Sequence, residues 1–163
     1  MGTLTHACVL GSGGPVQRKR EGDGGTPIAR MTLLAGRYRN DRLVRPRTRL
    51  PLTCLKETDG WCDDPGDGRY NQAVRLPVAS GHERMMRSDG LYDVVLVLDW
   101  NMLPRVRGRG SAIFFHLARA DRRPTEGCIA VDRAVMPRLL ARLGPGAVFE
   151  VHGVTPRKGT RRQ

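Results

Sequence analysis

The strongest constraint on the fold is an unbroken apolar run at positions 94–98 (VVLVL), inside Asp93–Trp100. Five apolar residues without an intervening polar position predict a strand that is buried on both faces. A second core strand is predicted over Ser111–His116, whose centre is also apolar. Shorter strands are expected at Ile28–Leu34 and at Ala147–Val151, the latter because its apolar residues alternate. The chain is therefore expected to be mainly β.

One helix is predicted near the C-terminal end. Apolar residues there lie at i, i+3, i+4 and i+7, which places them on one face of a helix: Met136, Leu139, Leu140 and Leu143. Either Asp132 caps the start of this helix or Pro137 marks its first turn, and Gly144-Pro145 supplies a stop signal. The predicted fold class is thus mainly β with one or two short helices.

The remaining segments are expected to be irregular. Gly11–Pro27 is rich in Gly and predicts an extended loop, and Arg45–Asp67 is rich in Pro, Gly and Asp. A length of 163 residues corresponds to about one domain, which we assign to residues 1–154. Residues 155–163 are polar and basic, and we expect them to form a disordered tail.

The formal net charge of +12 raises the question of a nucleic-acid partner. Three of the 28 basic residues are lysine, so 25 are arginine, and they are spread along the whole chain. Three Phe, three Tyr and two Trp are few for a surface that stacks bases. We therefore expect no nucleic acid, whereas an anionic polymer such as cell wall would suit the charge equally well. No stretch approaches the ~18 apolar residues that span a bilayer, and the N-terminus shows no signal-peptide pattern. These observations leave the compartment open, with the cytoplasm and the cell envelope as alternatives.

Four cysteines are present: Cys8, Cys54, Cys62 and Cys128. None of them forms a Cys-x-x-Cys pair, so a zinc site is not expected, and we expect no metal or other cofactor. Cys54 and Cys62 either bridge in an oxidising compartment or lie reduced in the core, and the sequence does not decide between these two states.

The residues most suggestive of chemistry lie in one stretch. His116 ends an apolar strand, a polar loop follows, and Thr125-Glu126-Gly127-Cys128-Ile129 comes next. A free thiol has a pKa of ~8.5, and a neighbouring imidazole can take its proton or hold the thiolate as an ion pair with a pKa of ~4–7. We therefore predict Cys128 as nucleophile and His116 as its base. The structural alternative is that both are ordinary core residues, as lone Cys and His residues usually are.

Gly127 has a predicted role of its own. Without a side chain it permits positive φ and lets a substrate approach the backbone. The N–H groups of Gly127 and Cys128 could then form an oxyanion hole, in which one donor typically lowers the barrier by ~3–4 kcal/mol.

This stretch resembles the signature of the L,D-transpeptidase catalytic domain (YkuD-like) family, in which a histidine after a strand precedes Ser/Thr-x-Gly-Cys and an aliphatic residue. The resemblance covers most of the chain through five further blocks, at residues 19–27, 60–65, 81–84, 91–93 and 108–128. It implies a β-rich, sandwich-like fold and a location in the cell envelope or periplasm. It also implies that the cysteine cleaves a peptidoglycan stem tetrapeptide before its terminal D-residue, and that a second amine resolves the thioester. We expect the enzyme to be a monomer.

Two positions depart from the family pattern. Many members have Gly where this chain has Leu117, and many have Arg or Asn where it has Ala130. The second change removes a side chain that could hold a substrate carboxylate, so an arginine of the intervening loop could replace it: Arg119, Arg122 or Arg123. The predicted substrate-binding residues are Thr125, Arg119 and His82, and for Arg119 and His82 a solvated loop position is the alternative. Glu126 is expected to face solvent.

Other functions remain open at this stage. The same acyl-enzyme could be hydrolysed, which would make the protein an L,D-carboxypeptidase. An inactive basic module that binds peptidoglycan or nucleic acid is a further alternative. The segment Trp61–Asp64 either lines the cleft or forms a turn anchored by a buried Trp. A papain-like hydrolase is disfavoured because such enzymes place Cys before His.

Overall fold

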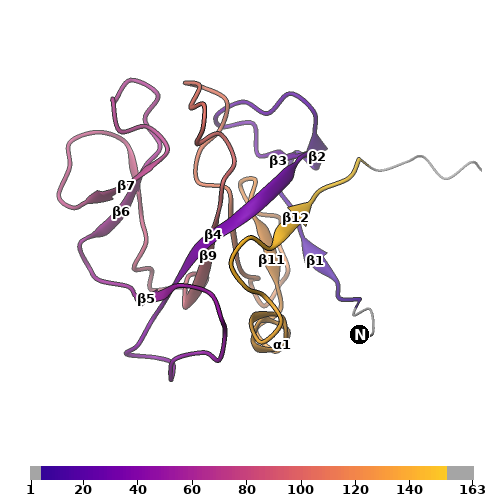
Figure 1. Cartoon of the computed structure of the whole chain (residues 1–163). Coiled ribbons are helices and arrows are strands. Elements are labelled where there is room, and N and C mark those ends of the chain that lie inside the picture. Colours follow the sequence, from indigo (N-terminus) through magenta and orange to yellow (C-terminus); the bar gives the residue numbers. More distant parts are fainter. Residues whose placement is uncertain (1–4, 154–163) are drawn as a thin grey trace, which may run out of the picture.

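The computed structural model describes residues 5–153. Its main sheet has seven strands (Figure 1). One of them, β5, pairs in parallel with the C-terminal end of β4, at residues 36–38. In spatial order the other strands are β1 (Cys8–Val9), β11 (Ile129–Val131), β10 (Phe114–Leu117), β9 (Val94–Leu98), β4 (Arg30–Tyr38) and β12 (Val148–Glu150), with β5 at Leu52–Cys54. The predicted tail at 155–163 lies outside the described residues, and the assignment of 1–154 to one domain stays a prediction.

The strand β9 is the centre of this sheet, as the apolar run predicts. All five of its residues are buried, and it pairs antiparallel with β4 and with β10. Leu96 and Leu98 pack into one apolar cluster, whereas Val95 and Val97 pack into a second cluster on the opposite face. The sheet is therefore covered on both sides.

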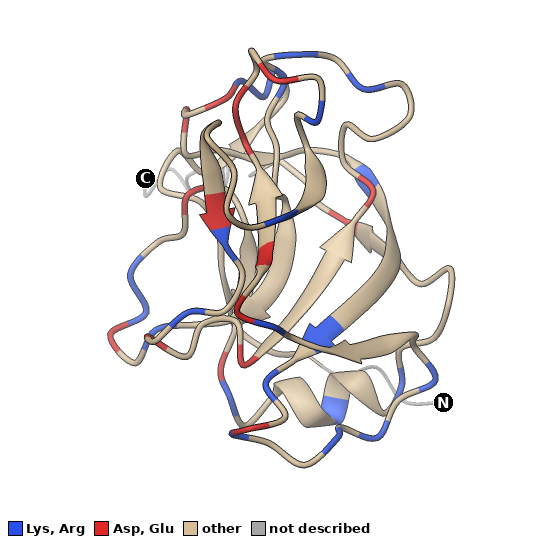
Figure 2. Cartoon of the chain, turned by 90° about the vertical axis from the view of Figure 1, so that its left-hand side faces the viewer, with Lys and Arg blue, Asp and Glu red and all other residues tan. Residues whose placement is uncertain are grey.

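A second sheet covers one of these faces. It has three antiparallel strands in the order β7 (Gln72–Arg75), β6 (Asp59–Cys62) and β8 (His82–Arg84). Trp61 of β6 packs edge-on against Phe114 of β10, with ring centroids 5.1 Å apart. This packing of one sheet on another confirms the mainly β class, and Figure 2 shows the strands from the side, with most charged residues on the connecting loops.

Two segments that were expected to be irregular contain short strands, so these predictions were wrong in part. The segment 11–27 includes the parallel pair β2 (Pro15–Val16) and β3 (Thr26–Pro27), and the segment 45–67 includes β5 and β6. The strands β2 and β3 pair with each other, whereas β5 and β6 pair with β4, β7 and β8, which lie outside the segment 45–67. In each case strand pairing forms the strand, and the local composition does not reveal it.

The single helix among the described residues is α1 (Met136–Leu140). Pro137 lies in its first turn, and the N-cap residue Val135 makes no side-chain cap, so Pro137 rather than Asp132 marks the start. Met136 and Leu140 are buried on the apolar cluster that includes Leu96, as their spacing predicts. The helix ends earlier than the Gly144-Pro145 signal indicates.

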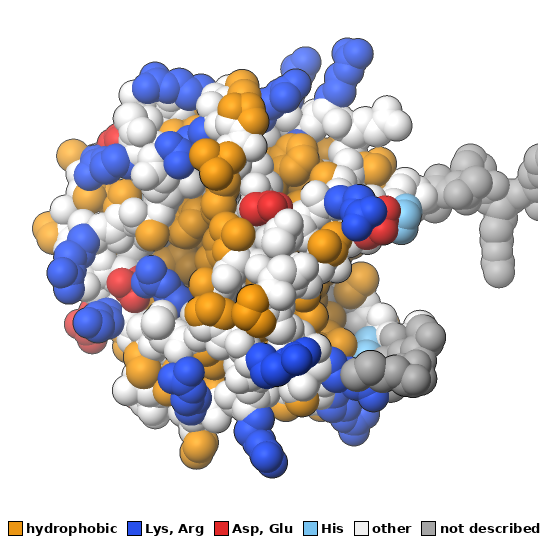
Figure 3. Space-filling model, in the orientation of Figure 1, with side chains coloured by type: hydrophobic (Ala, Val, Ile, Leu, Met, Phe, Trp, Pro, Cys, Tyr) orange, Lys and Arg blue, Asp and Glu red, His pale blue; other side chains and the backbone are white. Residues whose placement is uncertain are grey.

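The basic residues do not gather in one patch on the face seen in Figure 3, where Lys and Arg side chains are scattered. Among residues 5–153, eleven ion pairs join basic side chains to carboxylates, and all but one of the basic partners are arginines. Within residues 5–153 no helix has both the length and the apolar character needed to cross a bilayer.

The buried centre of β9 gives a stability prediction. Leu96 has 0 % of its surface exposed, and Leu96→Ala should lower the free energy of unfolding by about 2–5 kcal/mol because it leaves a cavity. Leu103 is 96 % exposed, and the same substitution there should change it by less than about 0.5 kcal/mol. Urea unfolding followed by circular dichroism measures both. Equal losses would contradict the central position of β9.

Candidate active site

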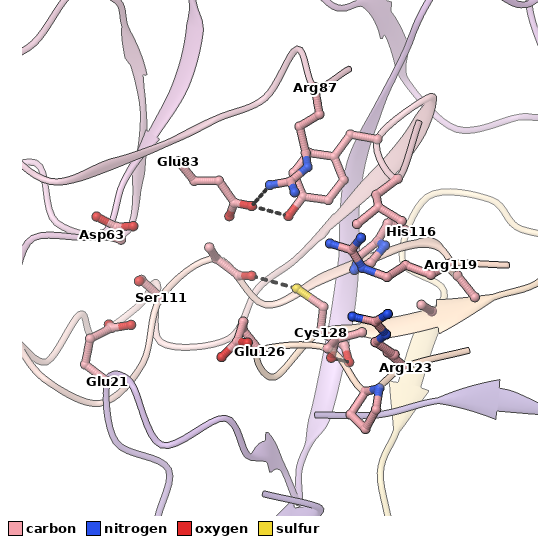
Figure 4. Close-up of a pocket in the computed structure, with 17 residues that line it drawn as sticks. Glu21, Asp63, Glu83, Arg87, Ser111, His116, Arg119, Arg123, Glu126 and Cys128 are labelled. Atoms are coloured by element: carbon pink, nitrogen blue, oxygen red, sulfur yellow. Dashed lines mark hydrogen bonds and ion pairs between the residues drawn. The ribbon is translucent and has the colours of Figure 1, made fainter. Parts of the chain in front are cut away.

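A cavity of about 220 Å³ lies beside the ends of β10 and β11. Cys128, His116, Thr125 and Arg119 are among the residues that line it. In Figure 4 the Cys128 thiol lies between two differently charged sides of this cavity. Glu21, Asp63 and Glu83 are on one side, and His116, Arg119 and Arg123 are on the other.

Strand pairing explains why His116 and Cys128 share this cavity. The strands β10 and β11 are parallel neighbours, and His116 pairs with Ala130. Side chains alternate between the two faces of a strand, so Cys128 and Ala130 point to the same side of the sheet as His116. Phe115 and Ile129 point to the other side, into the apolar core. His116 and Cys128 are consequently diagonal neighbours on one face.

The Cys128 thiol is held by backbone groups of the segment that leads into β10. Its Sγ accepts the Phe114 N–H at 3.3 Å and donates to the Ala112 carbonyl oxygen at 3.1 Å. The residue is 8 % exposed, and burial raises the pKa of the thiol to about 12, with the Glu83 carboxylate adding to the effect. The resting site therefore holds a neutral thiol, whereas a lowered pKa was expected from the sequence. The reason is that desolvation disfavours the thiolate.

The His116 ring is also neutral. It is 4 % exposed, and burial lowers the pKa of the imidazole to about 4. Its Nδ1 lies 2.8 Å from the Leu117 carbonyl oxygen, which can only accept a hydrogen bond. Nδ1 therefore carries the proton and Nε2 keeps a free lone pair. This is the form of histidine that can act as a general base.

Three residues of this site were not predicted from the sequence. The Tyr92 hydroxyl donates to Glu83 Oε1 at 2.6 Å, and Arg87 Nη1 donates to the same oxygen at 3.2 Å. The Tyr92 ring then packs edge-on against the His116 ring, with centroids 5.2 Å apart. Burial raises the pKa of Glu83, although the hydrogen bond from Tyr92 opposes this change. The network ties β8 to the imidazole.

The predicted binding residue His82 is not among the residues that line the cavity. Its Nδ1 lies 2.8 Å from the Ser80 carbonyl oxygen. Because β8 is a strand, His82 and its neighbour Glu83 point to opposite sides, and Glu83 is the one that reaches the site. The structure thus places Glu83 rather than the predicted His82 at the cavity, because the direction of each side chain depends on the strand register.

The loop before Cys128 packs directly on the Gly-rich N-terminal segment. Ser12 N–H donates to the Thr125 carbonyl oxygen at 2.9 Å. Gly127 has φ +129°, and a Cβ at that position would lie 2.8 Å from the Gly25 carbonyl oxygen. Only glycine fits there, so the requirement for Gly127 follows from both conformation and space.

Thr125 and Gly127 bond within this loop. Thr125 Oγ1 donates to the Cys128 carbonyl oxygen at 2.6 Å and accepts the Gly127 N–H at 3.2 Å. In this arrangement the Gly127 N–H, one of the two predicted oxyanion donors, is occupied by a side chain of the same loop. The Thr125 hydroxyl therefore stabilises the loop through hydrogen bonds to Gly127 and to Cys128, the residue after it.

The loop arginines differ in where they point. Arg119 and Arg123 line the cavity, and each also has a carboxylate partner outside the lining: Arg119 lies 3.7 Å from Asp89, and Arg123 lies 2.6 Å from Asp121. Arg122 pairs with Asp132 and is not part of the lining. Ala130 is buried, pairs with His116 and lines the same cavity.

Both interpretations of Trp61–Asp64 hold in part. Trp61 is buried and anchors the segment, whereas Asp63 lines the cavity, where burial raises its pKa. Glu126 is exposed, as expected, and also lines the cavity.

All four cysteines are free, so Cys54 and Cys62 do not form a disulfide. Within the described part of the chain no group of three or more His, Cys, Asp or Glu is arranged to hold a metal ion.

A comparison with protein-family models matches the L,D-transpeptidase catalytic domain (YkuD) over residues 2–151. The chain belongs to the L,D-transpeptidase catalytic domain family. The match includes His116 and Cys128 and confirms the resemblance seen in the sequence. Neither the curated proteins nor the solved structures gave a significant match. L,D-transpeptidase family members are generally acyltransferases that act on peptidoglycan, and they are typically extracytoplasmic cell-wall enzymes.

The neutral imidazole gives a pH prediction. Below the ordinary pKa of 6.5 the unfolded chain protonates His116 while the folded L,D-transpeptidase domain does not, down to about pH 4. Stability should therefore fall as pH drops from about 6.5 to about 4, by up to about 3 kcal/mol from this residue. Urea unfolding at several pH values should show a shallower decline for His116→Gln. The matched control is His152→Gln, an exposed histidine, which should keep the wild-type slope; equal slopes for all three proteins would contradict the assignment.

Proposed function

We propose that this protein is a cysteine-dependent L,D-transpeptidase that acts on peptidoglycan stem tetrapeptides. The observation that carries the proposal is the position of two groups in one cavity: the Cys128 thiol and a neutral His116 imidazole whose Nε2 is free to accept a proton. Membership of the family supports the substrate class. Stem peptides are the proposed partners, and a monomeric state, the absence of nucleic acid and a location in the cell envelope stay predictions.

In the proposed reaction, Sγ attacks the carbonyl carbon before the terminal D-residue while its proton passes to His116 Nε2. The C–N bond of the tetrahedral intermediate then breaks, and the leaving amine takes that proton. A thioester on Cys128 and a free D-amino acid result. The amine of a second stem attacks the thioester, gives a proton to Nε2, and the departing sulfur recovers it. The sum is one amide bond broken and one formed.

The thiol and the imidazole are both neutral before substrate binds. This favours transfer of the proton at the moment of attack over an ion pair that exists beforehand. Burial opposes charge on both groups, since it raises the pKa of Cys128 and lowers that of His116. The thiol first has to exchange its hydrogen bond to the Ala112 oxygen for one to Nε2.

The Cys128 N–H is the proposed donor to the oxyanion. The Gly127 N–H could join it only after leaving Thr125 Oγ1, so Thr125 acts as a support of the loop in this proposal.

A cavity of about 220 Å³ suits one or two residues of a peptide rather than a whole stem. Arg119 and Arg123 at its basic side are the proposed contacts for a substrate carboxylate, in the place of a side chain at Ala130.

Covalent labelling tests the proposal. Purified protein is incubated with a carbapenem, a reactive acyl donor, and its intact mass is measured. We expect one adduct on wild type, none on Cys128→Ala, and an adduct formed at least about a hundredfold more slowly on His116→Ala, because general base catalysis contributes about that much. Cys54→Ala is the matched control, since it removes an exposed thiol and should keep the adduct.

An adduct that persists in Cys128→Ala would remove the nucleophile assignment. Incubation with a tetrapeptide and an acceptor stem then separates transfer from hydrolysis. A transpeptidase yields a crosslinked product, whereas a carboxypeptidase yields free tripeptide.

A further inference from the structure

The position of the Cys128 thiol depends on a strained segment of backbone. Its two hydrogen-bond partners are the Ala112 oxygen, at the end of the loop between β9 and β10, and the N–H of Phe114, the first residue of β10. Ala112 has φ +53°, which is unfavourable for a residue with a Cβ. Such a conformation persists only where the surroundings enforce it.

The group that holds Ala112 is the side chain of Asn71, at the end of the connection between β6 and β7. The Ala112 N–H donates to Asn71 Oδ1 at 3.0 Å. The same oxygen accepts Trp61 Nε1–H at 3.0 Å. Asn71 Nδ2 donates to the carbonyl oxygens of Trp100 and Asn101, each at 3.0 Å.

Asn71 thus uses its full hydrogen-bonding capacity, two acceptor and two donor positions, in a site where it is 1 % exposed. Trp100 and Asn101 lie at the start of the loop between β9 and β10, and Ala112 lies at its end. One amide therefore joins both ends of this loop. No shorter or apolar side chain could satisfy the four backbone and indole groups at once.

We propose that Asn71 is a positioning residue for the nucleophile: through the Ala112 N–H it fixes the carbonyl oxygen that holds the Cys128 thiol. The inference rests on the proposed role of Cys128. Without Asn71 the backbone at Ala112 relaxes toward negative φ, its carbonyl turns away, and the sulfur loses its defined place beside His116.

The test compares rates of acylation by a carbapenem. In Asn71→Ala the maximal acylation rate constant should fall at least about tenfold, while the half-saturating concentration stays within about twofold, because the binding surface is unchanged. Trp61→Phe is the matched control. It removes the other hydrogen bond to the same oxygen and keeps the ring contact with Phe114, so its rate should stay within about twofold of wild type.

Rescue separates positioning from a general loss of stability. Glycine adopts positive φ without strain, so adding Ala112→Gly to Asn71→Ala should restore the rate at least about threefold, because strain of this size shifts a conformational equilibrium by about five- to thirtyfold. A rate for Asn71→Ala within twofold of wild type overturns the inference. A double variant no faster than Asn71→Ala overturns it as well.

Two further measurements keep the result decisive. Circular dichroism establishes that each variant is folded. If Asn71→Ala does not fold, Asn71→Ser replaces it, because serine is still polar but too short to reach Ala112. Alkylation by iodoacetamide, with mass analysis of the Cys128 peptide, does not depend on transpeptidase activity. Loss of Asn71 should speed alkylation of Cys128 at least about threefold at pH 8 and leave that of the exposed Cys54 unchanged.

These arms separate the two proposals. If wild type is not acylated but alkylation of Cys128 responds to Asn71 as expected, the proposed function fails, whereas the control of the thiol position by Asn71 through Ala112 is supported. If wild type is acylated and the acylation rate of Asn71→Ala is within twofold of it, the positioning role fails and the proposed function stands.

Discussion

The parallel pairing of β10 with β11 is the interaction on which the rest of the structure depends. It joins two strands that are separated by a polar loop and sets His116 opposite Ala130. Strand alternation then sends Phe115 and Ile129 into the apolar core and leaves His116 and Cys128 on the other face. The same hydrogen-bond ladder therefore builds the centre of the fold and brings together the two candidate reactive groups.

The burial that forms this site also sets its chemistry. A thiol and an imidazole that are both shielded from water remain neutral, because neither solvent nor a close counter-charge stabilises an ion pair. Glu83, Arg87 and Tyr92 form a charged network that contacts the imidazole through the Tyr92 ring. Within it the Glu83 carboxylate raises the pKa of the thiol, whereas Arg87 acts in the opposite direction. In the proposed reaction, a reactive thiolate would therefore form only when a substrate carbonyl is present.

The fold was largely predictable where local pattern and tertiary environment agree. The apolar run of β9 and the helical spacing of Met136 and Leu140 both reflect burial that a short window of sequence reveals. The strands β5 and β6 were not predictable, since their Pro-, Gly- and Asp-rich surroundings indicate loops and their partners β4, β7 and β8 lie outside that segment. Short strands of this kind form because other strands offer hydrogen bonds to them.

The sequence by itself determined the mainly β class, the family, and the choice of Cys128 and His116 as the residues to examine, because each of these depends on residue type and spacing. Tertiary structure alone decided that Glu83 rather than His82 faces the cavity, that Arg119 and Arg123 reach it while Arg122 does not, and that both reactive groups are neutral. It also brought Asn71 to the backbone beneath the thiol. The physical reason is that side-chain direction, desolvation and hydrogen bonds between distant loops arise only when the strands have paired.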